Sequence, residues 1–290
     1  MNRPPDATLP PSRDAGPLRV RWINPIGIPD YDAPIAALLG QIKDPLTAAQ
    51  VVSFRMDDSP HDLEYLTYEA LVTADLVRVV RDTAREGWDA AVVGCFYDVG
   101  LDAAREISGS TVVVAPCQAA CQTVVNLANR FSVIVGREKW VDQMRRNVLD
   151  YGYGGYLASF RAVGLSVEEF QKDPDRTARL MLEEGRKAIE QDHAEALVLG
   201  CTIEFGFYER MQDELGVPVI DCTLNAFKAA EHAARLKRSF AWSPSRQWGC
   251  EPPPEADLAR WKIFAAPAPI GNRVDIPPAP PPPAAPAAAG

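Results

Sequence analysis

The feature that most constrains the fold of this chain is a unit that occurs twice. Residues 94–100 read GCFYDVG and residues 200–206 read GCTIEFG, so both fit Gly-Cys-x-x-[Asp/Glu]-x-Gly. Each copy follows an apolar run, WDAAVV or AEALVL, and precedes an amphipathic segment and a second apolar run that ends in Cys117 or Cys222. Self-similarity over about 40 residues predicts two similar α/β lobes related by a pseudo-twofold axis, with Cys95 opposite Cys201.

The rest of the chain alternates in the same way between short Val- and Ile-rich runs and longer amphipathic segments. Strands are predicted at 18–25, 49–55, 88–94, 110–116, 131–136, 194–200 and 217–222, and helices at 66–86, 101–107, 117–130, 141–153, 176–191, 206–215 and 224–238. Within the first helix, Leu71, Leu76, Val79 and Val80 are among the apolar positions. This alternation predicts Rossmann-like lobes with parallel sheets covered by helices on both faces. Ligands of such sheets bind outside the carboxyl ends of the strands, so we expect an active site in the cleft between the lobes.

The lobes are predicted to be interleaved along the chain. We expect a flexible lead-in at 1–17, a first lobe at 18–125 plus 223–245, a second lobe at 126–222 and a C-terminal extension at 246–274. Residues 275–290, DIPPAPPPPAAPAAAG, consist almost entirely of Pro and Ala and predict a disordered tail rich in polyproline II. An inert tail is the preferred interpretation, and a ligand for a proline-binding groove is the alternative.

Charge and cysteine content restrict the partners and the compartment. The net charge of -9 disfavours nucleic acid and anionic membrane surfaces, which bind clustered Lys and Arg. No run of about 18 apolar residues spans a membrane, and the Pro-rich N-terminus lacks the apolar segment of a signal peptide. We therefore expect a cytoplasmic protein with a small-molecule substrate. Its six cysteines are then expected to be reduced thiols and not a disulfide framework.

The position of Cys95 and Cys201 favours reactivity. A cysteine at the end of a strand, just before a helix, lies near unpaired backbone N–H groups and the positive end of a helix dipole. These groups are expected to stabilise a thiolate and lower its pKa, and to stabilise an oxyanion or enolate on a bound substrate. The other four cysteines are interpreted as packing residues: Cys117, Cys121, Cys222 and Cys250.

Two thiols on opposite sides of one ligand suit a two-base proton transfer. One thiolate removes a proton from a carbon next to a carbonyl, and the other thiol returns a proton on the opposite face. A metal site is disfavoured because none of the three histidines is spaced with a cysteine as metal ligands would be. A redox pair would usually show C-x-x-C, which is absent.

These residues resemble the aspartate/glutamate/hydantoin racemase superfamily, and most closely its hydantoin racemase branch. The resemblance is carried by INP at 23–25, GCFYDVGLDAAREI at 94–107, YLASFRAVGLSV at 156–167 and LGCTIEFGFYERMQDELGVPVID at 199–221. It implies no cofactor, no metal, a possible homo-oligomer, and Cys95 and Cys201 as alternating acid and base. It also implies that Asn24 binds the substrate, as do the backbone N–H groups around Phe96, Tyr97 and Thr202. For Asp98 and Glu204, assistance to the adjacent cysteine and capping of the following helix stay open.

Departures from the family pattern leave the substrate open. Hydantoin racemases tend to read Asn-Pro-Asn-Thr where this chain has NPIG at 24–27. Relatives often have a Glu near the position of Gln118. A Tyr-Gly-x-x-His-Arg pattern of the family is replaced here by YGYGGY at 151–156. Four aromatic residues suggest an apolar substituent on the substrate: Phe96, Tyr97, Tyr153 and Phe205. Residues 59–70 could form a lid, with His61 either a ligand contact or a surface residue. A maleate-type isomerase, an arylmalonate-type decarboxylase and a non-catalytic ligand-binding module are the alternatives.

Overall fold

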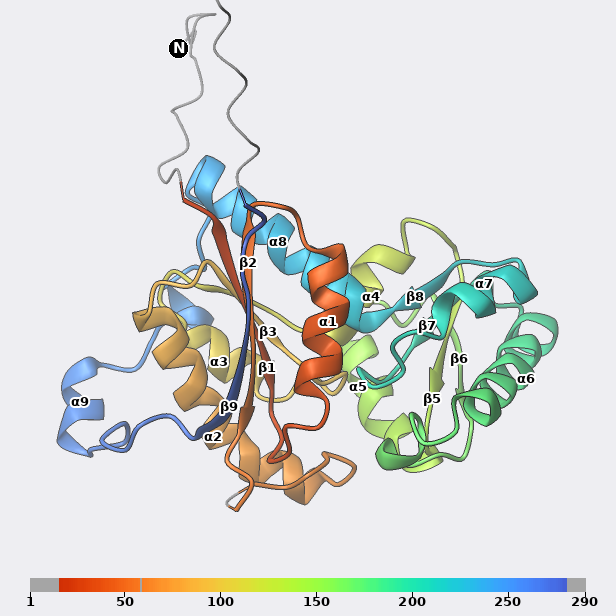
Figure 1. Cartoon of the computed structure of the whole chain (residues 1–290), viewed down its shortest axis with the longest axis horizontal. Helices are drawn as coiled ribbons and strands as arrows, with labels where there is room; N and C mark the ends of the chain where they lie inside the picture. The colour runs from red at the N-terminus through yellow and green to blue at the C-terminus, as the bar shows by residue number, and fades with distance from the viewer. Residues whose placement is uncertain (1–15, 58, 281–290) are drawn as a thin grey trace, which may run out of the picture.

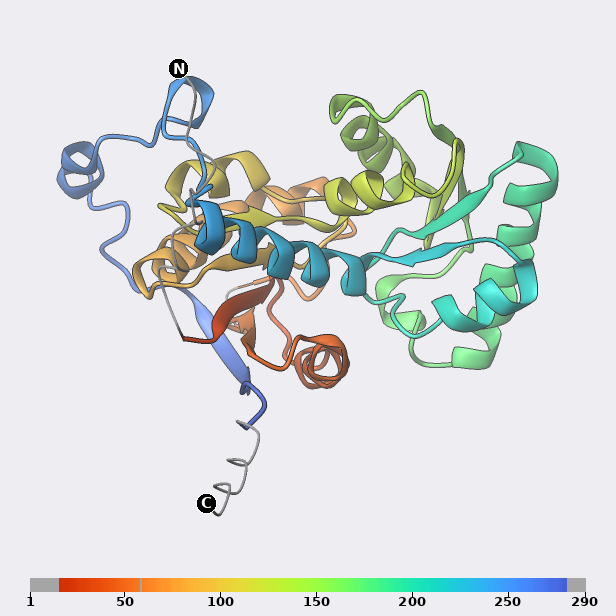
Figure 2. The same cartoon turned by 90° about the horizontal axis from the view of Figure 1, so that it is seen from above.

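Two separate sheets, one in each half of the molecule, organise the chain (Figures 1 and 2). The structure is a computed structural model, and it describes residues 16–57 and 59–280. The predicted parallel α/β architecture is confirmed in both halves. Most of the predicted lead-in and the end of the predicted tail lie outside the described residues.

The first sheet has five strands in the order β4-β3-β1-β2-β9. Its strands are β1 (Leu18–Asn24), β2 (Thr47–Phe54), β3 (Ala90–Val93), β4 (Val112–Val114) and β9 (Ile270–Ile276). The first four are parallel, and β9 runs antiparallel along the edge of β2. The carboxyl ends of β1 and β3, which carry the predicted site residues, therefore meet at one edge of this sheet.

The second sheet is fully parallel, with the strand order β6-β5-β7-β8. Its strands are β5 (Phe131–Val135), β6 (Leu157–Ala162), β7 (Ala196–Leu199) and β8 (Val219–Asp221). The two central strands, β5 and β7, are buried throughout, as expected for a sheet covered on both faces.

Helices cover both sheets. They are α1 (Asp32–Ile42), α2 (Leu66–Arg85), α3 (Leu101–Ile107), α4 (Pro116–Val124), α5 (Val141–Asp150), α6 (Pro174–Asp192), α7 (Tyr208–Leu215), α8 (Cys222–Phe240) and α9 (Glu255–Arg260). In the first lobe α1 and α8 contact each other and the first sheet, and α2 and α3 form a second contacting pair. In the second lobe α6 and α7 pack together against the second sheet. Helix α4 packs on both α8 and the second sheet, so it joins the lobes.

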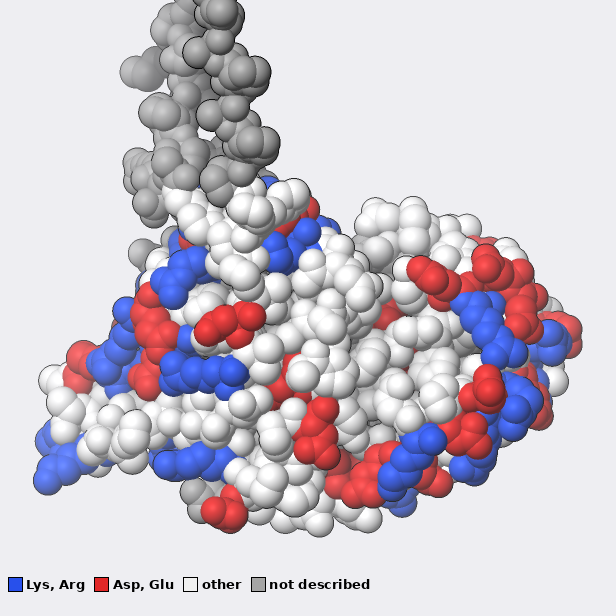
Figure 3. Space-filling view, viewed as in Figure 1, with Lys and Arg blue, Asp and Glu red and all other residues white. Residues whose placement is uncertain are grey.

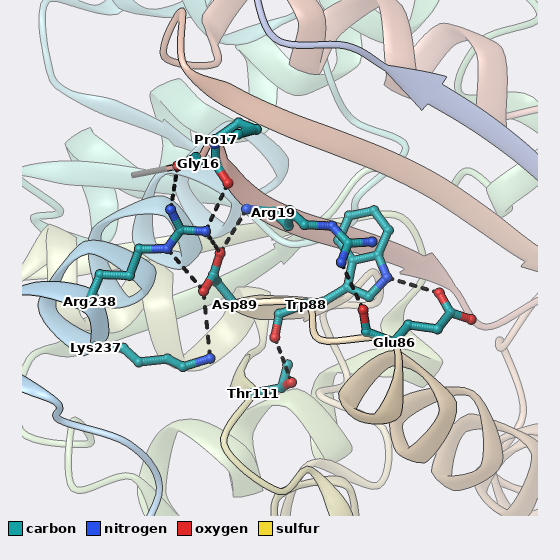
Figure 4. Close-up of polar contacts among 9 residues, drawn as sticks. All are labelled: Gly16, Pro17, Arg19, Glu86, Trp88, Asp89, Thr111, Lys237 and Arg238. Atoms are coloured by element: carbon teal, nitrogen blue, oxygen red, sulfur yellow. Dashed lines mark hydrogen bonds and ion pairs between the residues drawn. The ribbon is translucent and has the colours of Figure 1, made fainter. Parts of the chain in front are cut away.

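After the second sheet, α8 runs back along the first sheet, as Figure 2 shows. A carboxylate just before β3 anchors its C-terminal end (Figure 4). Asp89 accepts a hydrogen bond from the backbone N–H of Arg19 at 2.9 Å and from Arg238 at 2.5 Å, and the Lys237 ammonium lies 3.6 Å away. Because these charges are largely buried, the pairing fixes α8 more firmly than an exposed ion pair would.

The predicted strands and helices occur near the expected places, and four further helices and strands were not predicted: α1, β6, α9 and β9. Helix α1 has a proline in its first turn, where proline is tolerated, and carries little apolar periodicity. Strand β9 extends to Ile276, so the prediction of a disordered tail from residue 275 is wrong for Asp275 and Ile276, which belong to this strand. In α2, Leu76, Val79 and Val80 are buried but Leu71 is 63% exposed, so it lies on the solvent side of the helix.

Two predictions about the cysteines outside the repeat motifs are wrong. Cys117 and Cys222 lie in the first turns of α4 and α8 and not at strand ends. They are buried together with Cys121, in agreement with a packing role, whereas Cys250 is exposed and does not pack in the core.

Candidate active site

The two repeat motifs meet at the cleft between the lobes. Cys95 follows β3 and Cys201 follows β7, so each lies in the loop at the carboxyl end of a central strand. The glycine before each cysteine is required by close packing. A Cβ at Gly94 would approach the Trp22 indole nitrogen to 2.5 Å, and one at Gly200 would approach a Val133 methyl group to 2.8 Å. Both loops therefore lie directly on neighbouring strands.

The cleft is open to solvent and is lined by residues of both lobes. Six of the predicted site residues line it: Asn24, Cys95, Phe96, Tyr97, Cys201 and Thr202. Asp98 and Glu204 do not line it and are buried behind their cysteines. Tyr153 and Phe205, which the sequence suggested as substrate contacts, are not among the lining residues either.

Direct hydrogen bonds hold the two motif loops in place across the cleft. The Thr202 hydroxyl donates to the carbonyl of Gly94 at 3.1 Å, which joins the second motif to the first. The Asn147 amide of α5 donates to the carbonyl of Tyr97 at 2.7 Å. Because these bonds cross between lobes, they set the distance between the two halves of the site.

Burial dominates the acid–base properties of the two thiols. It raises the pKa of Cys95 to about 12, although the backbone N–H of Tyr97 acts in the opposite direction. It also raises the pKa of Cys201 well above its ordinary value, again against a backbone N–H, that of Ile203. The expected lowering of the thiol pKa is therefore wrong for both cysteines. The N–H groups are present as predicted, but they do not outweigh removal of the thiolate from water.

Asp98 caps a helix, but not the following one. Its carboxylate accepts the backbone N–H groups of Cys117 and Gln118 at 2.9 Å each, at the start of α4, and the Tyr151 hydroxyl at 2.9 Å. Burial nevertheless raises the pKa of Asp98 to about 7. The carboxylate thus connects the Cys95 loop to α4 and to the second lobe.

Glu204, the counterpart of Asp98 in the second motif, has a different environment. It is fully buried, and neither carboxyl oxygen accepts a hydrogen bond of good geometry from the described residues. Burial raises the pKa of Glu204 well above its ordinary value, and the nearby Asp221 acts in the same direction. Burial therefore favours the neutral form of the Glu204 carboxyl group, whose environment lacks the donors that Asp98 has.

Several cleft residues were not predicted individually: Pro25, Ile26, Asp62, Leu63, Glu64, Trp140, Met144, Val167 and Ile203. Glu64 belongs to the segment 59–70 that the sequence suggested as a lid. Its carboxylate accepts the backbone N–H of Val167 at 2.8 Å and forms an ion pair with Arg137, so the segment reaches the second lobe. His61 is exposed and does not line the cleft.

The charged residues that line the cleft are all acidic. Asp62 and Glu64 are its charged lining residues, and no Lys or Arg of residues 16–57 or 59–280 lines it. On the face shown in Figure 3, Lys and Arg lie mainly over the outer parts of the two lobes, and much of the surface between them is uncharged. In the described part of the chain, no group of three or more His, Cys, Asp or Glu side chains is arranged to hold a metal ion. None of the helices in the same residues is long and apolar enough to cross a membrane.

Each of the two α/β lobes carries a cysteine at the end of an equivalent strand, and both thiols line one cleft. This arrangement defines a class of two-lobed proteins with paired thiols. The family model for Asp/Glu/Hydantoin racemase matches residues 24–230, and the chain belongs to this family. This confirms the family resemblance of the motifs and the predicted isomerase class.

Relatives agree with this assignment. The chain is 38% identical over 186 residues to a hydantoin racemase from Rhizobium meliloti, covering 64% of this chain and 76% of the relative. It is 30% identical over 220 residues to a hydantoin racemase from Paenarthrobacter aurescens, covering 76% and 92%. Among solved structures, allantoin racemase from Klebsiella pneumoniae is similar with a TM-score of 0.76 and 26% identity, covering 82% of this chain and 94% of that one.

Proposed function

We propose that this protein is a cofactor-independent racemase of a 5-substituted hydantoin or a related amino-acid derivative. The observation that carries the proposal is that Cys95 and Cys201, at equivalent strand ends of two lobes, line one cleft. The relatives named hydantoin racemase and allantoin racemase act on ring compounds whose stereocentre lies next to a carbonyl, and they support this choice.

The proposed reaction removes one proton from the stereocentre and then adds another proton to it. The thiolate of one cysteine takes the proton from the ring carbon, and the electrons of the broken C–H bond move onto the adjacent carbonyl oxygen. The thiol of the other cysteine then gives its proton to the opposite face of the same carbon. The product has inverted configuration, and the two cysteines have exchanged protonation states.

Backbone N–H groups are available for the developing negative charge. Among the described residues, no hydrogen-bond acceptor pairs with the N–H of Phe96 or Thr202, which follow the two cysteines. Such donors stabilise an enolate oxygen most when water is excluded. The N–H of Cys95 is already bonded to the carbonyl of Val93 at 2.8 Å, so we exclude it from the proposed donors.

The cleft favours a neutral ring with an apolar substituent. Its acidic lining offers no countercharge to a substrate carboxylate, which disfavours aspartate, glutamate, maleate and arylmalonates. Apolar side chains from both lobes surround the remaining space, among them Phe96, Trp140 and Met144. A 5-benzyl or 5-alkyl hydantoin fits this environment better than a charged amino acid.

The test is to incubate the protein with one enantiomer of 5-benzylhydantoin in D2O, with a blank lacking protein. We expect optical rotation to decay and deuterium to enter the ring carbon. Cys95→Ser and Cys201→Ser should each abolish racemisation, and Cys250→Ser, at an exposed cysteine, should leave it unchanged. Full activity in either cleft variant would refute the two-base mechanism.

Other products would redirect the assignment. Release of CO2 from an arylmalonate would indicate a decarboxylase, and conversion of maleate without deuterium entry at a stereocentre would indicate a cis–trans isomerase. Tight binding of hydantoins with no turnover would favour a ligand-binding module. The cytoplasmic location and the homo-oligomer stay predictions.

A further inference from the structure

Asn24, which lines the cleft, is held in a single amide orientation. The indole N–H of Trp22 donates to its side-chain oxygen at 2.6 Å, and its amide nitrogen donates to Asp32 at 2.5 Å. One amide N–H is used by Asp32, which leaves the second for a ligand in the cleft. The direction of this remaining donor depends on where the Asp32 carboxylate lies.

Asp32 is itself fixed from three elements. It is the first residue of α1 and is fully buried. Besides Asn24, its carboxylate accepts the hydroxyl of Ser53 in β2 at 2.6 Å and the amide of Asn272 in β9 at 2.8 Å. Three donors on one buried carboxylate leave it little freedom to rotate.

The third donor comes from the C-terminal segment. Asn272 pairs with Ser53 in the β2–β9 ladder, and the register shifts just after this pair. The strand is seated tightly at this point, since a Cβ at Gly271 would lie 2.5 Å from the carbonyl oxygen of Phe54. The family match ends at residue 230, so β9 lies outside the region shared with the family model. Strand β9 therefore brings a residue from beyond that region to the support of the cleft.

We propose that Asp32 and Asn272 are positioning residues of the active site, acting on substrate through Asn24. The C-terminal strand then has a catalytic purpose in addition to covering the edge of the first sheet. Asn272 holds Asp32, and Asp32 aims the free amide N–H of Asn24 at a carbonyl oxygen of the ring. This inference rests on the proposed function for one point, the identity of the ligand that Asn24 contacts. The hydrogen-bond network itself does not depend on the proposed function.

A double-mutant cycle tests it in the full-length protein, with 5-benzylhydantoin as substrate. We expect Asn272→Ala to lower kcat/KM about tenfold and Asn24→Ala to lower it further. The double variant should be no worse than Asn24→Ala alone, because Asn272 acts through Asn24. The matched control is Arg273→Ala, at the next and exposed position of β9, which should leave kcat/KM unchanged. Equal losses from Asn272→Ala in both backgrounds, or no loss at all, would overturn the proposal.

A second measurement does not depend on turnover. In protein labelled with ¹⁵N-asparagine, the side-chain amide signals of Asn24 can be assigned by their absence in Asn24→Ala. Asn272→Ala should shift these signals and speed their exchange with solvent, and Arg273→Ala should not. If the wild type fails to racemise hydantoins, the proposed function is wrong, and these signals still decide the positioning network. Unchanged Asn24 signals in Asn272→Ala would refute it.

Discussion

Removal of the Tyr151 hydroxyl is expected to destabilise the protein by an amount that depends on pH. The hydroxyl donates to Asp98 across the two lobes at 2.9 Å. Burial raises the pKa of Asp98 to about 7, so this carboxyl group is mainly protonated at about pH 5.5 and ionised at about pH 8.5. A hydrogen bond to a charged group contributes about 1.5–3 kcal/mol and a neutral one about 0.5–1.5 kcal/mol. Tyr151→Phe should therefore cost more stability at the higher pH.

The sign follows from proton linkage. Folded Asp98 keeps its proton to a higher pH than unfolded Asp98, so its contribution to the free energy of unfolding falls as pH rises from about 4 to about 7. The Tyr151 hydroxyl favours the ionised form and limits this fall. Without it the pKa of Asp98 rises further and the fall continues to higher pH.

Thermal unfolding at the two pH values measures the effect. An unfolding entropy of about 2.1 cal/mol/K per residue converts these energies into a decrease of about 2.5–5 °C in Tm at pH 8.5 and about 1–2.5 °C at pH 5.5. Tyr153→Phe is the matched control, because the Tyr153 hydroxyl forms no hydrogen bond with the described residues, and it should change Tm by less than about 1 °C. An equal decrease at both pH values would show that Asp98 does not change its ionisation in this range, and no decrease would refute the contribution of the bond.

Three further predictions follow from burial and packing. Because burial raises the pKa of both cleft thiols, kcat/KM should rise from about pH 7 to pH 9 as the first thiolate forms, and a maximum near pH 6 would contradict this. Leu76→Ala should lower the free energy of unfolding by about 2–5 kcal/mol and Leu71→Ala by less than about 0.5 kcal/mol, as urea denaturation would show, since the first side chain is buried and the second exposed. Gly94→Ala should cost about 1–3 kcal/mol and reduce racemisation at least tenfold because its Cβ would collide with a neighbouring indole, whereas Gly155→Ala, with open space around it, should do neither. Equal effects of the two alanines would argue against the close approach at Gly94.

The sequence was most informative where local pattern and tertiary environment agree. The apolar runs before Cys95 and Cys201 predicted central strands, and such strands are buried on both faces in the structure. The repeat placed the two cysteines at equivalent strand ends of two different sheets. Because a pseudo-twofold axis between two such lobes brings the carboxyl ends of their sheets face to face, the approach of both thiols to one cleft could be predicted. Strand β9 could not, because Asn272 and Asp275 are polar and Gly271 interrupts the run, so its pairing with β2 depends on a partner more than 200 residues away in sequence.

The chain's own residues determined the class of the site, and tertiary structure decided its electrostatics. Two copies of one cysteine motif were enough to predict a symmetric two-lobed α/β protein. The symmetry of the motifs also suggested equal roles for Asp98 and Glu204, yet Asp98 receives three donors and Glu204 receives none of good geometry from the described residues. Burial depth and donor supply come from residues distant in sequence, such as Tyr151 and the start of α4. For the same reason the two thiols have raised pKa values, since their burial depends on residues of both lobes that line the cleft.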